Sequence, residues 1–330
     1  MKVIIPVAGI GSRLAPHTFT VPKALVHVAG KELLAHILDK VADIKEVTEV
    51  VFVVGYLGEQ IVDYVNENYK FKSKFIFQKE RKGLGHAIYM AINEFDNKEN
   101  EPVTIILGDT LFDMDLNKIF EEKGDGVIVT SIVENPERFG VVVKKNNFIT
   151  DFIEKPETPV SNRAIVGIYF IKNLTMLVES LKFIIDNNIK TRGEYQLTDA
   201  LQRMLKKGAN FTDVLSNKWF DCGKPETLLE TNREFLKLAK NENEKKYRNT
   251  VLIEPVYISP NAVVENSIIG PYVSIAPDTK IRSSIIRDSI INRGAKIKSC
   301  IMADSLIGHN AVVSSRYSKF NISDSSEFEA

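Results

Sequence analysis

The chain has 330 residues, which is enough for a large core and for two domains. Its 44% hydrophobic and 26% charged residues are typical of a soluble globular protein, and its 43 basic and 43 acidic residues cancel, which gives no support for non-specific binding of nucleic acid. No run approaches the roughly 20 apolar residues of a membrane span, and the two cysteines are typical of a reducing compartment, so we expect a cytoplasmic protein without a membrane or nucleic-acid partner.

Strands and helices alternate over the first 110 residues. Short apolar runs predict strands, and apolar residues at helical spacing predict the helices between them. The predicted strands are 2–8, 47–56, 74–78 and 102–109, and the predicted helices are 32–44, 58–69 and 85–95. This alternation predicts an α/β fold, a Rossmann-like mixed, mostly parallel sheet with helices on both faces. Ligands of such sheets bind beyond the carboxyl ends of the strands.

The rest of the chain divides into regions with different sequence patterns. Mixed strands and helices over 127–220 continue the first domain, and an amphipathic helix at 225–240 closes it. We therefore predict a catalytic domain at 1–240, a charged linker at 241–250, a repeat domain at 251–318 and a tail at 319–330.

The predicted repeat domain has an aliphatic residue at every fifth or sixth position. Ser-Ile-Ile recurs at 267–269, 284–286 and 289–291, with small and turn residues between the repeats. Neither a helix nor an alternating strand gives this spacing, whereas a C-terminal left-handed β-helix of hexapeptide repeats does.

The first predicted strand leads into "VAGIGSRLAPHTFTVPKAL" at 7–25. Gly9 and Gly11 let the backbone approach a ligand, and Arg13 and Lys23 supply cations suited to phosphate. The G-x-G pattern matches neither the dinucleotide fingerprint nor the P-loop, so by itself it fits a tight turn equally well.

The loop gains specificity from the motifs that follow it. A-G-x-G-S-R-L with a later P-K-x-L resembles the signature of the sugar-1-phosphate nucleotidyltransferases. Further matching segments occur in the family's order: QKERKGLGHAI (78–88), LGDTLF (107–112), ERFGVV (137–142), IEKP (153–156), VGIYF (166–170), RGEYQLTDAL (192–201) and WFDCG (219–223). The resemblance implies an enzyme that joins a nucleoside triphosphate to a sugar 1-phosphate and releases pyrophosphate.

The resemblance also implies residue roles at the nucleotide. Arg13, Lys23 and Asp109 would be catalytic, and Asp109 and Asp221 would hold Mg²⁺, a hard ion that prefers carboxylate and phosphate oxygens. The residues expected at the nucleotide are Ala8, Gly9, Gly11, Ser12, Arg13, Lys23, Gln78, Gly83 and Gly108.

The expected sugar-phosphate residues lie in the later motifs. They are Gly140, Glu154, Lys155, Gly167 and Arg192. Glu154 would accept hydrogen bonds from sugar hydroxyls, and Lys155 and Arg192 would grip the attacking phosphate. No protein nucleophile is needed, because a sugar phosphate is already ionised at neutral pH. The histidines, His86 among them, are expected to be packing or surface residues.

The substrates and the assembly stay open at this stage. The loop and the repeat domain resemble glucose-1-phosphate uridylyltransferases and long-form thymidylyltransferases, which favours dTTP or UTP with glucose 1-phosphate. A mannose-1-phosphate guanylyltransferase and a non-catalytic regulatory or assembly subunit are the alternatives. We also expect a homo-oligomer, because an open β-helix end exposes strand edges and apolar surface.

Overall fold

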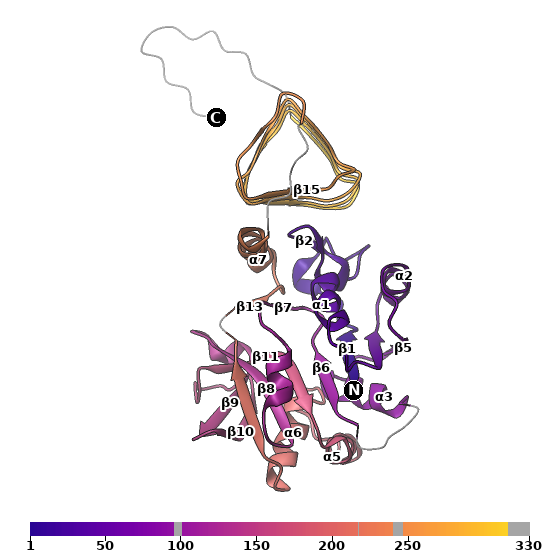
Figure 1. Ribbon diagram of the computed structural model, residues 1–330, viewed down its shortest axis with the longest axis vertical. Coiled ribbons are helices and arrows are strands. Elements are labelled where there is room, and N and C mark those ends of the chain that lie inside the picture. The colour runs from indigo at the N-terminus through magenta and orange to yellow at the C-terminus, as the bar shows by residue number, and fades with distance from the viewer. Residues whose placement is uncertain (96–100, 217, 240–246, 316–330) are drawn as a thin grey trace. The chain divides into compact units, whose positions relative to one another are not determined.

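The computed structural model describes residues 1–95, 101–216, 218–239 and 247–315 (Figure 1). The chain forms two compact units, one of residues 1–26 and 31–228 and one of residues 27–30 and 229 onward. Most of the predicted linker and all of the predicted tail lie outside the described residues. The predicted domain boundary at 240 stays a prediction.

A nine-stranded mixed sheet is the centre of the first unit. Its main order is β10-β9-β11-β6-β1-β4-β5, with β8 on β11 and β12 on β8. Strands β6, β1, β4 and β5 run parallel, whereas β11 is antiparallel to its neighbours. The bounds are β1 Lys2–Val7, β4 Glu49–Val54, β5 Ser73–Phe77, β6 Val103–Ile106, β8 Gly126–Ile132, β9 Gly140–Lys145, β10 Phe148–Glu154, β11 Arg163–Ile171 and β12 Phe211–Leu215.

Helices and both sheet faces share the core of this unit. Ile4 of β1 belongs to one buried cluster with residues of α3, α5 and α6, while Val3 and Ile5, which point the other way, are also fully buried. The helix bounds are α1 Leu33–Ala42, α2 Gly58–Asn68, α3 Leu84–Asn93, α4 Asn117–Glu121, α5 Leu174–Asp186, α6 Leu197–Lys206 and α7 Pro225–Leu238. The predicted Rossmann-like fold is thereby confirmed. No helix in the described part of the chain combines the length and apolar character needed to cross a membrane.

A small two-stranded ribbon was not predicted. Strand β7 (Thr110–Phe112) follows β6 almost directly and pairs antiparallel with β13 (Trp219–Asp221). The ribbon joins segments about a hundred residues apart in the sequence, and each of its strands has only three residues. Neither strand is long enough to show a periodic pattern.

The second unit is a stack of short parallel strands with a triangular outline in Figure 1. Paired positions follow one another along the chain in steps of 17, 17 and 16 residues, as in Val251, Ile268, Ile285 and Ile301. Its three four-stranded sheets are consistent with the predicted left-handed β-helix. Their strands are β14 Val251–Leu252, β15 Val256–Ile258, β16 Val263–Glu265, β17 Ile268–Ile269, β18 Val273–Ile275, β19 Lys280–Arg282, β20 Ile285–Ile286, β21 Ser289–Ile291, β22 Lys296–Lys298, β23 Ile301–Met302, β24 Leu306–Ile307 and β25 Val312–Ser314.

Buried polar contacts fix α7 to this stack. Asn232 is fully buried; it accepts a hydrogen bond from Ser274 Oγ at 2.7 Å and donates to Tyr272 O at 3.1 Å. Arg233 pairs with Asp288 and Asp304, which lie on successive coils. The later part of α7 is therefore part of the β-helix unit.

Candidate active site

The carboxyl ends of the parallel strands lie at one edge of the sheet. Ala8 follows β1, Gln78 follows β5 and Leu107 follows β6, and the parallel registers place these three ends at the same edge, with β4 between β1 and β5. Two cavities open there. This is the edge at which an α/β sheet binds its ligands.

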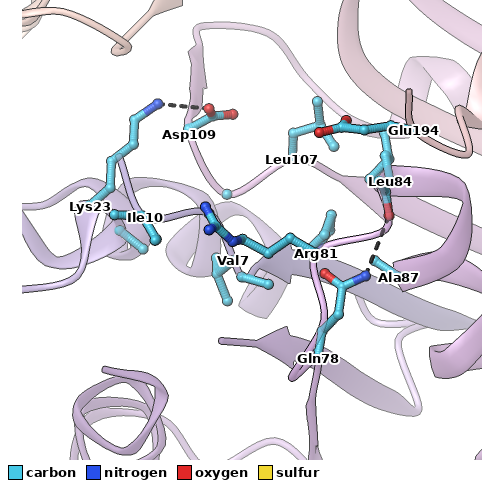
Figure 2. A pocket seen from close by; sticks show the side chains of 16 residues that line it. Val7, Ile10, Lys23, Gln78, Arg81, Leu84, Ala87, Leu107, Asp109 and Glu194 are labelled. Atoms are coloured by element: carbon cyan, nitrogen blue, oxygen red, sulfur yellow. Dashed lines mark hydrogen bonds and ion pairs between the residues drawn. The ribbon is translucent and has the colours of Figure 1, made fainter. Parts of the chain in front are cut away.

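The first cavity, of about 430 Å³, is called the glycine-loop cavity here (Figure 2). It contains most of the residues predicted for the nucleotide. Those that line it are Ala8, Gly9, Lys23, Gln78, Gly83 and Gly108, and Asp109, predicted as a catalytic and metal-binding residue, lines it too. Arg81, Leu84 and Glu194, for which the sequence predicted no role, line it as well.

The second cavity, of about 450 Å³, is called the Trp219 cavity here. It combines residues predicted for the sugar phosphate with residues predicted for catalysis. Those that line it are Arg13, Asp109, Gly140, Glu154, Lys155 and Asp221. Gly11, Ser12, Gly167 and Arg192 line neither cavity. Leu84, Leu107 and Asp109 line both cavities, so the two cavities adjoin at these residues, and Asp109 is the charged one among them.

Two glycines are required by close packing around the glycine-loop cavity. A Cβ on Gly108 would lie 2.1 Å from Val7 Cγ1, so no side chain fits where β6 leaves the sheet. Gly11 has φ +71°, and a Cβ there would lie 2.9 Å from Lys23 Cβ. Gly11 therefore allows the loop to fold back over Lys23, although it does not itself line the cavity.

Lys23 and Asp109 form an ion pair across the loop. Lys23 Nζ lies 2.7 Å from Asp109 Oδ2, with the lysine side chain 10% exposed and the carboxylate 46% exposed (Figure 2). Removal of water around Asp109 by itself raises the pKa of its carboxyl, but the charge and hydrogen bond of Lys23, together with the charge of Arg13 and a backbone hydrogen bond, lower the pKa below its ordinary value. The carboxylate is thus ionised and available to a cation.

The β7–β13 ribbon brings the two predicted metal ligands together. Thr110, next to Asp109, is the register partner of Asp221, and Cys222 N donates to Asp109 O at 3.4 Å. Among the described residues, no three or more histidine, cysteine or acidic side chains lie so that they could hold one metal ion together. Asp109 directly precedes β7 and Asp221 ends β13, and two such carboxylates fit a hard cation that takes its remaining oxygens from phosphate.

Guanidinium groups surround the second of these acids. Arg138 Nη2 lies 3.4 Å from Asp221 Oδ2. A Cβ on Gly223 would lie 2.6 Å from Arg13 Nη2 and 2.9 Å from Asp221 Oδ1, so Gly223 leaves the space in which both groups lie. Arg138 was not assigned from sequence, although the quoted segment 137–142 contains it.

Hydrogen bonds hold the ribbon in place. Trp219 Nε1 donates to Thr110 Oγ1 at 2.6 Å, and Thr110 Oγ1 donates to Val166 O at 2.8 Å. Trp219 also packs edge-on against Phe139, with ring centroids 4.9 Å apart. This chain ties both acid-bearing strands to β11.

The far end of the Trp219 cavity is polar and partly buried. Glu154 Oε2 accepts a hydrogen bond from Thr198 Oγ1 at 3.1 Å, and a Cβ on Gly140 would lie 3.1 Å from the same oxygen. Tyr169 also lines this end, and burial together with the charge of Glu154 raises the pKa of its hydroxyl, which stays protonated. Such a group can donate to a sugar oxygen.

Lys155 and Arg192 both have left-handed backbones, with φ +42° and +54°. Arg192 Nη2 donates to Lys155 O at 2.8 Å, so the two predicted phosphate-binding segments are joined. Left-handed conformations of such residues are uncommon and cluster at functional sites. Gly167, in contrast, packs against Leu107, where a Cβ would lie 2.8 Å from Leu107 Cδ1. Its place in the structure is behind the cavity wall rather than in it.

Comparison with known proteins adds to this geometry. The family model "Nucleotidyl transferase" matches residues 2–237. The bifunctional protein GlmU of Methanocaldococcus jannaschii is 36% identical over 77% of the chain, but the match spans only 59% of that relative's length. The UTP–glucose-1-phosphate uridylyltransferase AglF of Haloferax volcanii is 31% identical over 68% of the chain and 93% of the relative. A solved structure, a putative glucose-1-phosphate thymidylyltransferase from Bacillus anthracis, has a TM-score of 0.61 at 26% identity and covers 74% of this chain and 98% of its own.

Proposed function

Because the chain belongs to the nucleotidyl transferase family, we propose that it transfers a nucleoside monophosphate from a nucleoside triphosphate to a sugar 1-phosphate. One observation carries the proposal: two cavities of similar size meet at Asp109, one lined by the glycine loop and the other by acids and cations. Each cavity has room for one substrate, and their junction would hold the α-phosphorus.

The reaction would form one P–O bond and break another. An oxygen of the sugar phosphate attacks the α-phosphorus and forms a new P–O bond, and the bond from that phosphorus to the β-phosphate oxygen breaks. Pyrophosphate leaves with the bonding electron pair. The chain need only hold the reactants in line and balance their charge, so no covalent protein intermediate is required.

The residues divide between the two anions. Lys23 would lie at the α-phosphate and Arg13 at the leaving β- and γ-phosphates. Lys155 and Arg192 would hold the attacking phosphate from the sugar side, with Glu154 accepting from sugar hydroxyls. Arg138, which pairs with Asp221, adds a cation on the same side.

Asp109 and Asp221 would hold Mg²⁺, since both line the Trp219 cavity and carboxylates suit this ion. Bound there, the ion would neutralise phosphate charge. The ion pair with Lys23 keeps Asp109 ionised before any cation binds, and it would have to loosen when a cation arrives.

We favour UTP or dTTP as nucleotide and glucose 1-phosphate as acceptor. The similarity to AglF, whose name records UTP and glucose 1-phosphate, supports this choice over GTP and mannose 1-phosphate. The test is pyrophosphate release with Mg²⁺ for dTTP, UTP, GTP and CTP against glucose, mannose, galactose and N-acetylglucosamine 1-phosphates. Release with GTP and mannose 1-phosphate alone would identify a guanylyltransferase, and release nowhere would identify a non-catalytic subunit of the same architecture.

We also propose that the chain is a cytoplasmic homo-oligomer. Val251, Ile268, Ile285 and Ile301 form one register row on the β-helix, and their exposed fractions range from 36% to 78%. Such a row of aliphatic side chains is suited to burial against another copy. Light scattering of the wild type and of Ile285→Lys tests this, and a wild-type monomer at all concentrations would contradict it.

A further inference from the structure

The side-chain amide of Gln78 lies in the wall of the glycine-loop cavity, directly after β5 (Figure 2). The residue is only 7% exposed. Its Nε2 atom lies 3.4 Å from the carbonyl oxygen of Gly83 and 3.1 Å from Nδ1 of His86. Two neighbours therefore act on one end of the amide.

The carbonyl of Gly83 determines whether the NH₂ or the oxygen of the Gln78 amide faces these two neighbours. A carbonyl oxygen can only accept, so the group facing it must be the NH₂. This oxygen is held in place, because it also accepts from Ala87 N at 3.2 Å at the start of α3. Gly83 itself has φ +102°, and a Cβ there would lie 2.6 Å from Tyr195 O, so the turn has little freedom. Figure 2 shows the amide oxygen of Gln78 on the side away from this contact.

His86 then has to be an acceptor at Nδ1. Because the NH₂ of Gln78 faces it, the neutral imidazole carries its proton on Nε2. Burial lowers the pKa of His86, and the charge of Lys82 lowers it further, against a smaller opposite effect of Glu80. The ring stacks on Tyr195, with centroids 6.5 Å apart, and Lys190 lies over the same tyrosine. The neutral form is thus favoured at neutral pH.

We propose that His86 is a positioning residue that, together with Gly83, holds the Gln78 amide with its oxygen toward the nucleotide base. The inference rests on the proposed function and deepens it by naming the class of base. A fixed acceptor selects a base that presents a ring N–H beside a carbonyl, as uracil, thymine and guanine do and cytosine does not.

Cytosine presents the opposite hydrogen-bonding pattern at the corresponding ring nitrogen. Its N3 carries a lone pair, which would face the amide oxygen of Gln78 without a proton between them. Rotation of the amide would relieve that contact, but it would turn the oxygen toward Gly83 O and toward His86 Nδ1, which are both acceptors. Leaving buried polar groups unpaired in this way is how a site rejects a near-isosteric ligand.

The test compares UTP with CTP in the wild type and in variants at position 86. His86→Phe keeps an aromatic ring but removes the acceptor. The ratio of kcat/KM for UTP to that for CTP should fall about tenfold in this variant, because the loss of one hydrogen bond has an effect of this size. His86→Gln should restore most of the ratio, since its amide oxygen can accept in place of Nδ1. Tyr89→Phe, on the same helix, is the matched control and should leave the ratio unchanged.

A pH series gives a second readout within the wild type. Because burial lowers the pKa of His86 below the ordinary imidazole value of about 6.5, the UTP-to-CTP ratio should fall only on further acidification through this lowered pKa, where protonated Nδ1 would face the NH₂ of Gln78. In His86→Phe the ratio should not depend on pH in this way. The same comparison by equilibrium binding of UTP and CTP does not require turnover.

The outcomes separate the two proposals. If the wild type neither binds nor turns over any nucleotide, the proposed function is rejected. An active wild type whose ratio is unchanged in folded His86→Phe would reject the role of His86. If that variant does not fold, the wild-type pH series decides, and a ratio that stays flat on acidification overturns the inference.

Discussion

The two cavities of the first unit solve different recognition problems. The glycine-loop cavity is lined largely by glycines and aliphatic groups, whereas the Trp219 cavity is lined by arginines, a lysine and three acids. Several charged side chains that the second cavity presents are tied to another, as Arg138 is to Asp221 and Lys155 to Glu154, with 3.6 Å between the latter pair. A neutral base can be read by fixed backbone and amide groups, but phosphates need charges, and long charged side chains need partners to hold them.

Asp109 belongs to both cavities, so its loss should have the largest effect. In Asp109→Asn the carboxamide is close to isosteric, but it carries no charge for a cation and cannot form an ion pair with Lys23. We expect pyrophosphate release to fall by about a thousandfold or more, since electrostatic stabilisation of this kind contributes on that scale. Asp113→Asn, a nearby exposed acid that pairs with Lys218, is the control. Unchanged turnover in folded Asp109→Asn would remove the metal assignment.

The next prediction tests whether the glycine-loop cavity depends on backbone shape. Gly108→Ala places a methyl against Val7 and should lower both the melting temperature and the affinity for UTP, the latter by about tenfold. Gly9 has nothing within 4 Å of its would-be Cβ. Gly9→Ala should therefore leave stability unchanged and weaken only nucleotide binding. Equal nucleotide binding by Gly9→Ala and wild type would place the nucleotide elsewhere.

The next prediction concerns Lys155, which lines the charged Trp219 cavity. Lys155→Ala should raise the KM for the sugar phosphate about tenfold, as expected for the loss of one charge-assisted contact, and leave the KM for the nucleoside triphosphate unchanged. Lys145→Ala, an exposed lysine on β9, controls for general loss of charge. An equal rise in both KM values would mean that Lys155 does not belong to one substrate.

Sequence and structure agree most closely where a function rests on local chain properties. The strands, the glycine loop and the repeat coils follow from apolar runs, glycines and a short period, each readable within a few residues. Arg138 and Trp219 instead depend on the β7–β13 ribbon and its partners, which tertiary pairing alone creates. His86 looked like a packing residue because its contact with Gln78 depends on the tautomer of the ring and the orientation of an amide, neither of which leaves a pattern in the sequence.

The smallest effect on catalysis is expected from a buried acid outside both cavities. Asp213 is 1% exposed and accepts from Arg163 at 2.7 Å and Thr130 at 2.6 Å, with Lys144 as a further partner. Burial alone raises the pKa of Asp213, but these partners lower it below its ordinary value. The carboxylate therefore stabilises the fold above the unfolded pKa of about 4, and this contribution is lost as the pH falls through the folded pKa.

Asp213→Asn should lower the free energy of unfolding at neutral pH by about 3 kcal/mol, because Arg163 and Lys144 lose their buried counter-charge. The difference from wild type should shrink in acid, where the wild-type carboxyl is protonated as well. Denaturant unfolding at several pH values measures both effects, and kcat/KM for each substrate should stay near wild type. A change in substrate preference without a loss of stability would show that the sheet under the cavities, and not only their linings, sets recognition.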